Sequence, residues 1–391
     1  MAFVSPGFLP DRSRPAWFGN ALATLFIAVI VIGLAGSFRT PDAVNTAIEN
    51  RTVESLPAFP ESGAALREFP ARFERSFNDR FGLRAALVKF DHWTKAVAFG
   101  ASPLSKVLIG KSGWLYFRGE DAKAFERWYR GTEAVPDATI DALRDELLRR
   151  QAFLASRGIP YIFVIVPEKY SVYPEFLPDW ATRITSRTPL DRLVTQLARN
   201  PQLVFLDLRD PLKAAKGGDK LYYQTDSHWN YLGAMVGYRA LMSKVQQKLP
   251  GLVVAPAKRP PYVPKSDYYS GDLAQMLGLT RQFREADIAP LGRVAATPEV
   301  RCAQRDTSPD APGVETYVFL CPNAPRFSAV VYRDSAAVWL RPLLPQNFSR
   351  TTFVSSPGLD PELVERLRPD IVIQELVERS LPGLIGSPLK R

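Results

Sequence analysis

The chain has 391 residues, 46% of them hydrophobic, which supplies one large core or two moderate ones and excludes a disordered protein. Its formal net charge of +10 would attract polyanions such as acidic polysaccharide, phospholipid headgroups or nucleic acid. The basic residues are interspersed with acidic ones and form no basic run, so we expect no nucleic-acid partner, and a generally arginine-rich composition explains the charge equally well.

The first predicted element is an uncharged, apolar stretch at residues 17–37, long enough as a helix to cross a hydrocarbon core of about 30 Å. Arg12 and Arg14 precede it, and this positive-inside bias predicts that residues 1–16 are cytoplasmic and that the bulk of the chain is exported. Residues 34–37 poorly resemble a signal-peptidase site, so the pattern favours an uncleaved signal anchor over a cleaved signal.

Residues 38–70 carry several prolines and little periodicity, which predicts a spacer. From residue 71 to residue 100 apolar residues recur at mostly helical spacing, and we expect a helical region broken near Gly82. It contains His92, whose neighbours on a helix would point in other directions, so we assign it a structural role. Residues 110–117 predict a turn entering a short strand, without the spacing of a nucleotide-binding loop.

Helical and buried-strand patterns then alternate. A helix is predicted from Pro136 to a terminating Gly158, and another over residues 190–199. Short, continuous apolar runs predict strands covered on both faces: 159–166, 203–208, 328–332 and 371–373. This alternation predicts an α/β domain with a mainly parallel sheet, whose site lies beyond the carboxyl ends of the strands.

Two candidate halves of a site follow two of these strands. Asp226 and His228 follow the run at 203–208, and Ser335 stands where the run at 328–332 gives way to a helix. His228 is one of only two histidines, and an imidazole is the side chain best suited to act as a base near neutral pH. Asp226 would then orient His228, His228 would activate Ser335, and the first N–H groups of the helix would hold an oxyanion.

Structural explanations remain open for each of these residues. Ser335 could simply be an N-cap, and Asp226 with His228 could form a capping device or part of a metal site. We expect no metal, because no further ligands are evident. Cys302 and Cys321 lie in a Pro-rich segment without histidine, which favours a single disulfide over zinc and fits an oxidising compartment, although two unrelated thiols would also satisfy the spacing.

At this point the sequence resembles the membrane-anchored alginate O-acetyltransferase family, whose domain is SGNH-hydrolase-like. The resemblance spans roughly residues 60 to 380 and is carried chiefly by three motifs, 225–229, 331–335 and 368–379, with supporting stretches at 78–82, 113–115 and 166–174. It implies an SGNH-hydrolase-like three-layer domain, which we place at residues 71–391.

The resemblance also implies roles. Carried over, Ser335 is the nucleophile, and His228 and Asp226 complete the triad. The implied activity is transfer of acetyl to hydroxyls of an exported polysaccharide in the periplasm, without a cofactor, by a single-pass inner-membrane protein that works with a multispanning membrane acyltransferase as acetyl supplier. One departure is Ala336, where the family usually has an aromatic residue.

Lower-ranked substrate-binding candidates lie near these motifs: Arg333, Trp229, Tyr268 and Asp272. Arg333 could hold a substrate carboxylate or the acyl oxygen, or be paired within the protein. Trp229 could stack on sugar rings or be packed. Two other functions remain compatible with the sequence: a polysaccharide acetylesterase that uses the same triad, and a non-catalytic polysaccharide-binding subunit of an export complex.

Overall fold

The computed structural model describes residues 16–36, 55–81, 83–254, 265–288, 302–306 and 314–389. The chain divides into two compact units, residues 1–99 and residues 100–391. The predicted break at Gly82 and most of the predicted spacer lie outside the described residues. The boundary between the units falls at residue 100, whereas the amphipathic pattern in the sequence begins at residue 71.

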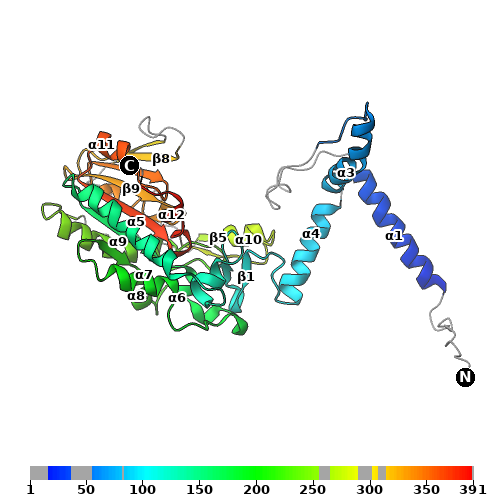
Figure 1. The fold of residues 1–391 in the computed structure, drawn as a ribbon. Helices are drawn as coiled ribbons and strands as arrows, with labels where there is room; N and C mark the ends of the chain where they lie inside the picture. The colour runs from blue at the N-terminus through cyan, green and yellow to red at the C-terminus, as the bar shows by residue number, and fades with distance from the viewer. Residues whose placement is uncertain are drawn as a thin grey trace, which may run out of the picture. The chain divides into compact units, whose positions relative to one another are not determined.

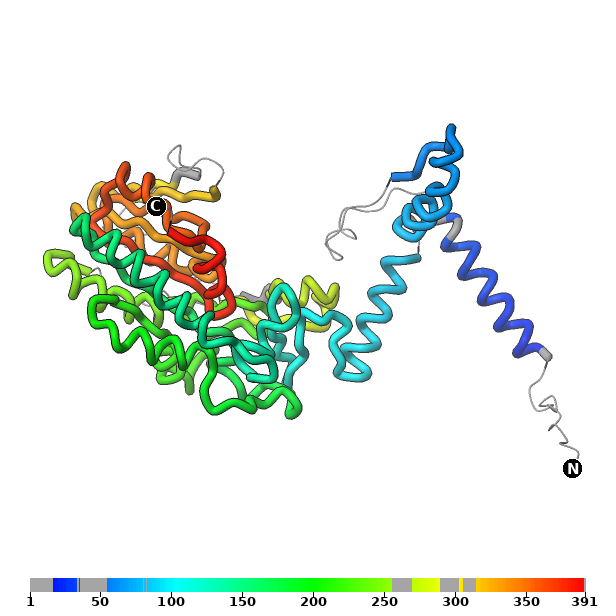
Figure 2. The backbone as a smooth tube through the Cα atoms, in the orientation of Figure 1, coloured from blue at the N-terminus to red at the C-terminus, as the bar shows by residue number. Residues whose placement is uncertain are grey.

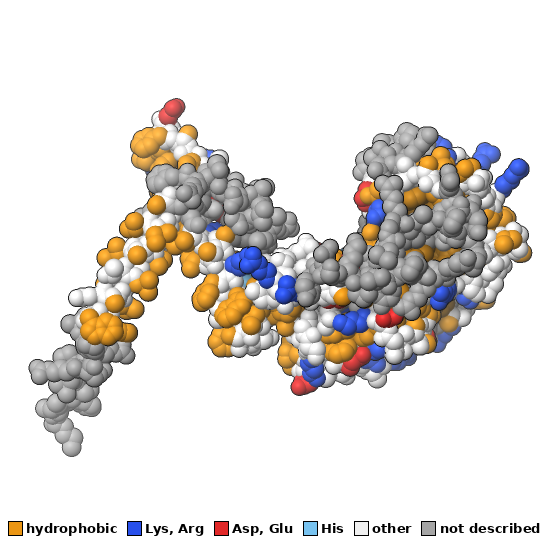
Figure 3. Space-filling model, turned by 180° about the vertical axis from the view of Figure 1, so that it is seen from behind, with side chains coloured by type: hydrophobic (Ala, Val, Ile, Leu, Met, Phe, Trp, Pro, Cys, Tyr) orange, Lys and Arg blue, Asp and Glu red, His pale blue; other side chains and the backbone are white. Residues whose placement is uncertain are grey.

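The first unit is helical. Helix α1 (Ala16–Gly36) carries outward-facing apolar side chains, among them Trp17, which is 68% exposed, and Phe26, which is 67% exposed (Figure 3). Among the residues with described positions, no helix is both long enough and apolar enough to cross a membrane. The membrane span at residues 17–37 therefore stays a prediction.

Two further helices follow in this unit. Helix α3 (Gly63–Arg80) begins within the predicted spacer because the side chain of Ser62 accepts a hydrogen bond from the N–H of Ala65 and caps it. Helix α4 (Arg84–Trp93) continues as a π-helical turn, η1 (Thr94–Ala98).

The second unit is built on a seven-stranded mixed sheet (Figure 1). Its strands, in spatial order, are β4 (Val204–Asp207), β3 (Tyr161–Val166), β11 (Ile371–Val377), β9 (Ser328–Arg333), β10 (Arg350–Ser355), β8 (Thr316–Leu320) and β7 (Ala303–Asp306). The first five run parallel to one another, and the last two pairings are antiparallel. The predicted α/β fold with a mainly parallel sheet is confirmed, and the antiparallel edge makes the sheet mixed.

Helices cover both faces of this sheet and make three layers (Figure 2). One face packs against α5 (Asp137–Ala155), α7 (Pro189–Leu197), α11 (Pro361–Leu367) and α12 (Gly383–Gly386), and the other against α8 (Arg209–Ala214) and α9 (Tyr231–Lys248). Along β3, Phe163 and Ile165 enter the first core while Ile162 and Val164 enter the second. This burial on both faces explains the continuous apolar run of β3 in the sequence.

Smaller elements complete the second unit outside the main sheet. Strands β1 (Val107–Ile109) and β2 (Leu115–Phe117) form one antiparallel pair, with η2 (Lys111–Gly113) between them, and β5 (Lys265–Tyr269) and β6 (Glu285–Asp287) form another. Helix α10 (Asp272–Met276) follows β5. The remaining short turns are η3 (Glu126–Arg130), α6 (Lys169–Val172), η4 (Pro174–Phe176), η5 (Asp179–Ala181), η6 (Ser335–Trp339), η7 (Pro345–Asn347) and η8 (Glu378–Ser380).

Two local predictions are also met. Gly158 adopts a φ of +69° just after α5, a left-handed conformation that favours glycine and ends the helix. Cys302 and Cys321 form a disulfide that joins the residue before β7 to the residue after β8 at the antiparallel edge of the sheet.

Candidate active site

The loop that carries Asp226 and His228 ends at the start of α9. Asn230 caps this helix, because its side-chain oxygen accepts hydrogen bonds from the N–H groups of Leu232 and Gly233 at 2.9 and 3.1 Å. Just before it, the indole N–H of Trp229 donates to the carbonyl of Ala336 at 2.7 Å. This loop, residues 223–229, is called the histidine loop below, and the bond of Trp229 joins it directly to the segment that follows Ser335.

Ser335 lies where β9 ends and η6 begins. Asp334 holds this junction: Oδ1 accepts from the N–H of Ala336 at 2.9 Å and Oδ2 accepts from the N–H of Val377 at 2.8 Å. The N–H of Ala336 is thus already occupied. The sequence predicted that the first backbone N–H groups after the serine would be unpaired and able to bind an oxyanion. This prediction is wrong for Ala336, because the side chain of Asp334 accepts from its N–H and caps the turn.

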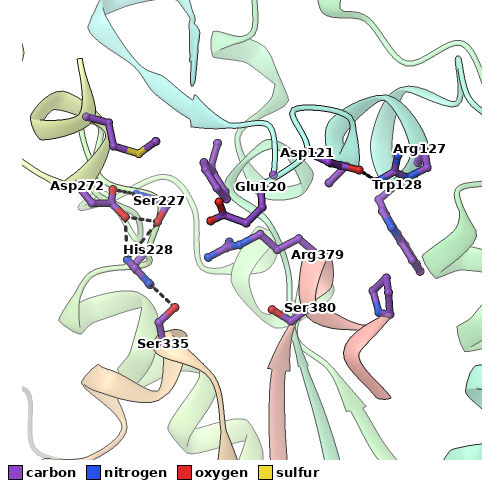
Figure 4. Close-up of a pocket in the computed structure, with 15 residues that line it drawn as sticks. Glu120, Asp121, Arg127, Trp128, Ser227, His228, Asp272, Ser335, Arg379 and Ser380 are labelled. Carbon is purple, nitrogen blue, oxygen red and sulfur yellow. Dashed lines mark hydrogen bonds and ion pairs between the residues drawn. The ribbon is translucent and has the colours of Figure 1, made fainter. Parts of the chain in front are cut away.

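The two halves meet at the imidazole of His228. Nε2 lies 2.9 Å from Oγ of Ser335, and Nδ1 lies 2.7 Å from Oδ1 of Asp226 (Figure 4 shows His228 beside Ser335). Since the ionised carboxylate can only accept, Nδ1 carries the proton and Nε2 is left to accept from the serine hydroxyl. This is the tautomer that a base acting on Ser335 requires.

A second carboxylate supports the loop. Asp272, at the start of α10, accepts from the N–H of Ser227 at 2.7 Å and from its hydroxyl at 2.5 Å, and its Oδ2 lies 3.6 Å from Nδ1 of His228. The backbone of Gly271 approaches Asp226 so closely that a Cβ there would lie 2.4 Å from the Cβ of Asp226. The packing of the two loops therefore requires glycine at position 271.

Potential ligand atoms of Asp226, His228 and Asp272 all lie within 4.8 Å of one another, so the cluster could in principle hold a cation. Their hydrogen bonds argue for another use. Nδ1 of His228 already faces Oδ1 of Asp226, and Oδ2 of Asp226 accepts from Tyr269 and from the N–H of Asp272. A metal would have to displace these protons.

The surroundings set the charges of the site. Burial favours the neutral form of Asp226, but the hydrogen bond and charge of His228, with the hydroxyl of Tyr269, outweigh it and hold the pKa of Asp226 well below its usual range. Burial likewise favours neutral His228, yet the hydrogen bond to Asp226 and the charges of Asp226 and Asp272 raise the pKa of His228 above 6.5. Burial and the nearby charge of Asp226 raise the pKa of Asp272.

Ser335 and His228 open onto a pocket of about 590 Å³. Besides Ser227, His228, Asp272 and Ser335, it is lined by Phe117, Gly119, Glu120, Asp121, Ala124, Arg127, Trp128, Met276, Arg379, Ser380 and Pro382. Arg379 extends into it toward His228 while donating to buried Glu168 at 2.7 Å (Figure 4). The pocket thus offers aromatic, cationic and acidic groups next to the serine, which suits a polar, hydroxyl-bearing substrate.

The lower-ranked candidates fare differently. Arg333 does not line the pocket, because its guanidinium is buried and donates to Glu315 at 2.7 Å. Trp229 is 1% exposed and packed beneath the serine segment, so the expectation of sugar stacking needs correction. Asp272 does line the pocket. Tyr268 lies in β5, and its side chain is outside the described residues.

Several residues of the site were not predicted from the sequence. Arg379 belongs to the motif at 368–379, where its place directly after a strand was an available signal. Lys169 lies in the supporting stretch at 166–174, just after a predicted strand, but neither it nor Glu285 could be linked to the histidine loop from the sequence, because their contacts are to segments more than fifty residues away. The same holds for the pocket residues of 117–128.

Comparison with known proteins points to acetyltransferases as relatives of this chain. A family model described as "SGNH hydrolase-like domain, acetyltransferase AlgX" matches residues 107–312, more than half of the chain. The chain is 26% identical over 296 residues to the probable alginate O-acetylase AlgJ of Pseudomonas syringae pv. tomato, a match that covers 71% of this chain and 69% of that protein.

Solved structures overlap it in part. The O-acetyltransferase domain of Pseudomonas putida AlgJ is 20% identical, with a TM-score of 0.44 over 71% of this chain and 92% of that one. Bacillus cereus PatB1 is 15% identical, with a TM-score of 0.47 over 71% and 98%. The family match contains Asp226 and His228 and ends before Ser335. On the strength of that match, this chain belongs to the family of AlgX-type acetyltransferases with an SGNH hydrolase-like domain.

Proposed function

We propose that this protein is an O-acetyltransferase that moves acetyl groups onto hydroxyls of an exported polysaccharide through an acetyl-Ser335 intermediate. The observation that carries the proposal is the continuous hydrogen-bond path from Asp226 through His228 to Ser335, which opens on a pocket in a chain of an acetyltransferase family. Relatives named as probable alginate O-acetylases support a polysaccharide as the acceptor.

The reaction has two halves. In the first, Nε2 of His228 takes the hydroxyl proton as Oγ of Ser335 bonds to the acetyl carbon, and the donor leaves with that proton as its bond to the acetyl group breaks. In the second, a sugar hydroxyl gives its proton to Nε2 and bonds to the acetyl carbon, and Nε2 passes that proton to Oγ of Ser335 as the bond between Oγ and the acetyl carbon breaks. Asp226 keeps the imidazole in the required tautomer and stabilises its charged form throughout.

A small activated acetyl ester tests the chemistry. The full-length chain is incubated with the ester and an acidic oligosaccharide, and acetyl is located on protein and sugar by mass spectrometry. We expect acetyl on Ser335 and, with time, on the sugar. Ser335→Ala should lose both, while Ser328→Ala, on the opposite end of the same strand, should keep both.

The outcomes separate the competing functions. Acetate released without acetylated sugar would point to an esterase with the same triad. Undiminished turnover in Ser335→Ala would exclude the acetyl-serine mechanism. In cells, normal polymer acetylation by folded Ser335→Ala and His228→Ala variants would instead favour a non-catalytic polysaccharide-binding subunit.

We also infer that residues 17–37 anchor the protein in the inner membrane, with the catalytic domain in the periplasm. The uncharged sequence and the exposed apolar side chains of α1 support the anchor, and a disulfide between Cys302 and Cys321 suits an oxidising compartment. Such a placement calls for an acetyl supplier across the membrane, and we propose a multispanning acyltransferase as partner.

Cell fractionation tests this placement. The wild type should stay in the membrane fraction after alkaline carbonate extraction, and its domain should be cut by protease in spheroplasts but not in intact cells. A variant with Ile27→Asp and Ile30→Asp should be extracted. A wild-type protein found in the soluble fraction, or protected in spheroplasts, would contradict the proposal. The partner should co-purify with the wild type from detergent extracts, and its absence from such extracts would count against it.

A further inference from the structure

A buried lysine lies under the histidine loop. Lys169 opens α6, directly beyond the carboxyl end of β3, and is only 2% exposed. Its Nζ donates to three backbone carbonyls of the loop, those of Tyr223 at 2.9 Å, Gln224 at 3.0 Å and Asp226 at 2.6 Å. An ammonium has three N–H donors, and all three have an acceptor here.

A buried carboxylate holds the opposite side of the same backbone. Glu285, on β6, accepts from the N–H of Gln224 at 2.8 Å and from the N–H and hydroxyl of Thr225, both at 2.7 Å. The loop belongs to neither a helix nor a strand at these residues, so its polar groups need partners from other segments. These two side chains supply most of them, and the N–H groups of Leu115 and Ala274 add bonds to the carbonyls of Gln224 and Thr225 at 2.9 and 3.2 Å. Together they fix the backbone from which the carboxylate of Asp226 projects.

The shortest contact of Lys169 is to the carbonyl of Asp226, the residue that orients His228. A small rotation of this backbone would move the Asp226 carboxylate and, with it, the imidazole facing Ser335. We propose that Lys169 is a positioning residue of this acetyltransferase: its ammonium holds the histidine loop in the one conformation that directs Nε2 of His228 at Ser335. The proposal rests on the proposed function for its catalytic consequence.

The charge of Lys169 is part of this role. Burial lowers the pKa of Lys169 to about 8, although the negative charges of Glu285, Asp226, Asp272 and Glu168 oppose the effect. The rings of Trp114 and Tyr116 complete its surroundings. A neutral amine keeps two donors and gains a lone pair. Above pH 8 Lys169 therefore offers one donor fewer to these three carbonyls, and its hold on the loop weakens.

The first test replaces the ammonium by an apolar group of similar length. In Lys169→Met we expect kcat on the activated acetyl ester to fall about 10- to 100-fold, because small misplacements of catalytic groups have effects of this order. KM should change less than twofold, since Lys169 does not line the pocket. Lys220→Met is the control: it removes a lysine that donates to the side-chain oxygen of Gln224 and not to a backbone carbonyl of the loop, and it should retain wild-type kcat.

A second readout follows His228 directly. The chain has two histidines, so His92→Gln leaves His228 as the only imidazole in ¹⁵N spectra. The ring shifts report the tautomer. In the wild type at pH 7.5 the neutral ring should carry its proton on Nδ1, facing Asp226. In Lys169→Met the Nε2–H tautomer, which a released imidazole prefers, should grow. An unchanged tautomer together with unchanged kcat would overturn the proposal.

The third test asks whether the positive charge of Lys169 is what matters. Lys169→Arg keeps a cation that stays protonated at every accessible pH. The wild-type rate should decline above about pH 8, after subtraction of the Ser335→Ala blank, and this decline should be absent in Lys169→Arg. If Lys169→Met does not fold, the pH–rate profiles of the wild type and Lys169→Arg test the proposal. The same decline in rate above pH 8 in both proteins would refute the role of the ammonium. If neither variant folds, the tautomer of wild-type His228 decides: it should shift as the pH passes 8, and a constant tautomer to pH 10 refutes the role.

These measurements distinguish the two proposals. If the wild type transfers no acetyl at all, the proposed function fails, but the tautomer of His228 still shows whether Lys169 orders the loop. If the wild type transfers acetyl and Lys169→Met does so equally well with its tautomer unchanged, only the positioning role fails.

Discussion

The hydroxyl of Tyr269 donates to Oδ2 of Asp226 at 2.5 Å, on the oxygen opposite the one that faces His228. Asp226, a residue that is 5% exposed, is thereby bonded on both carboxylate oxygens by groups that favour its ionised form. A buried charge is stable only with such partners. The strand β5 and the histidine loop therefore share one electrostatic centre, and this arrangement leads to testable consequences.

Tyr269→Phe should lower the free energy of unfolding by about 1.5–3 kcal/mol at pH 7, the range for a hydrogen bond to a charged group. Because the pKa of Asp226 is depressed in the folded state, its stabilisation is present above its unfolded pKa and is lost as the pH falls through its folded pKa. The difference between variant and wild type should therefore shrink as the pH is lowered below 4. Urea denaturation at several pH values measures it.

Tyr223→Phe is the matched control. Its ring lies beside that of Tyr269, with centroids 4.3 Å apart, and its hydroxyl pairs with Asp287 at 3.1 Å instead of Asp226. If lowering the pH changes the free energy of unfolding of Tyr223→Phe as much as that of Tyr269→Phe, the effect does not pass through Asp226.

Asp226→Asn should reduce turnover of the acetyl ester by about 10³- to 10⁴-fold, because the amide can present a donor to Nδ1 and so favours the wrong tautomer of His228. Asp272→Asn should cost about tenfold or less, since its carboxylate lies 3.6 Å from Nδ1 and mainly binds Ser227. Steady-state rates of the two variants, with folding checked by circular dichroism, provide the comparison. Equal losses would mean that the roles of the two carboxylates are misassigned.

Activity and stability should change in opposite directions near neutral pH. His228 must be neutral to accept the serine proton, so the rate should rise as the pH passes its pKa, which lies above 6.5. The raised pKa also means that protonated His228 stabilises the fold below pH 6.5 and that this contribution is lost as the pH rises through the folded pKa. Rates and urea midpoints from pH 5 to pH 8 check both trends, with His228→Ala as the stability reference. An acid limb centred below 6.5 would contradict the prediction.

Removal of the disulfide should destabilise the second unit without affecting the hydrogen bonds of His228 to Asp226 and Ser335. The two bridged cysteines are 19 positions apart in the sequence. For a loop of that length, the loss of chain entropy in the unfolded state predicts a stabilisation of about 3 kcal/mol. We expect the double variant Cys302→Ala and Cys321→Ala to unfold at lower urea concentration, and the wild type to shift equally when reduced. Its kcat at 25 °C should match that of the oxidised wild type. A large drop in kcat in the folded variant would place the bridge in the catalytic machinery.

The sequence by itself determined the layered α/β core and the two halves of the site. Continuous apolar runs predicted β3, β4, β9 and the start of β11, because strands buried on both faces cannot alternate. The antiparallel edge strands β8 and β7 and the parallel strand β10 were not predicted, since pairing partners are set by the sheet and not by local pattern. His228 was a candidate because the chain has only two histidines, and Ser335 was a candidate because it follows the predicted strand at 328–332.

Only the tertiary structure decided how these residues are used. It brings Nε2 of His228 within 2.9 Å of Ser335 across 107 positions of sequence, and it pairs Arg333 with Glu315, away from the pocket. It also buries Lys169 and Glu285 under the histidine loop. Local sequence encodes helix caps and strand faces, whereas hydrogen bonds between distant segments depend on how the layers pack. For that reason the contacts of Lys169 and Glu285 with the histidine loop could not be predicted from the sequence.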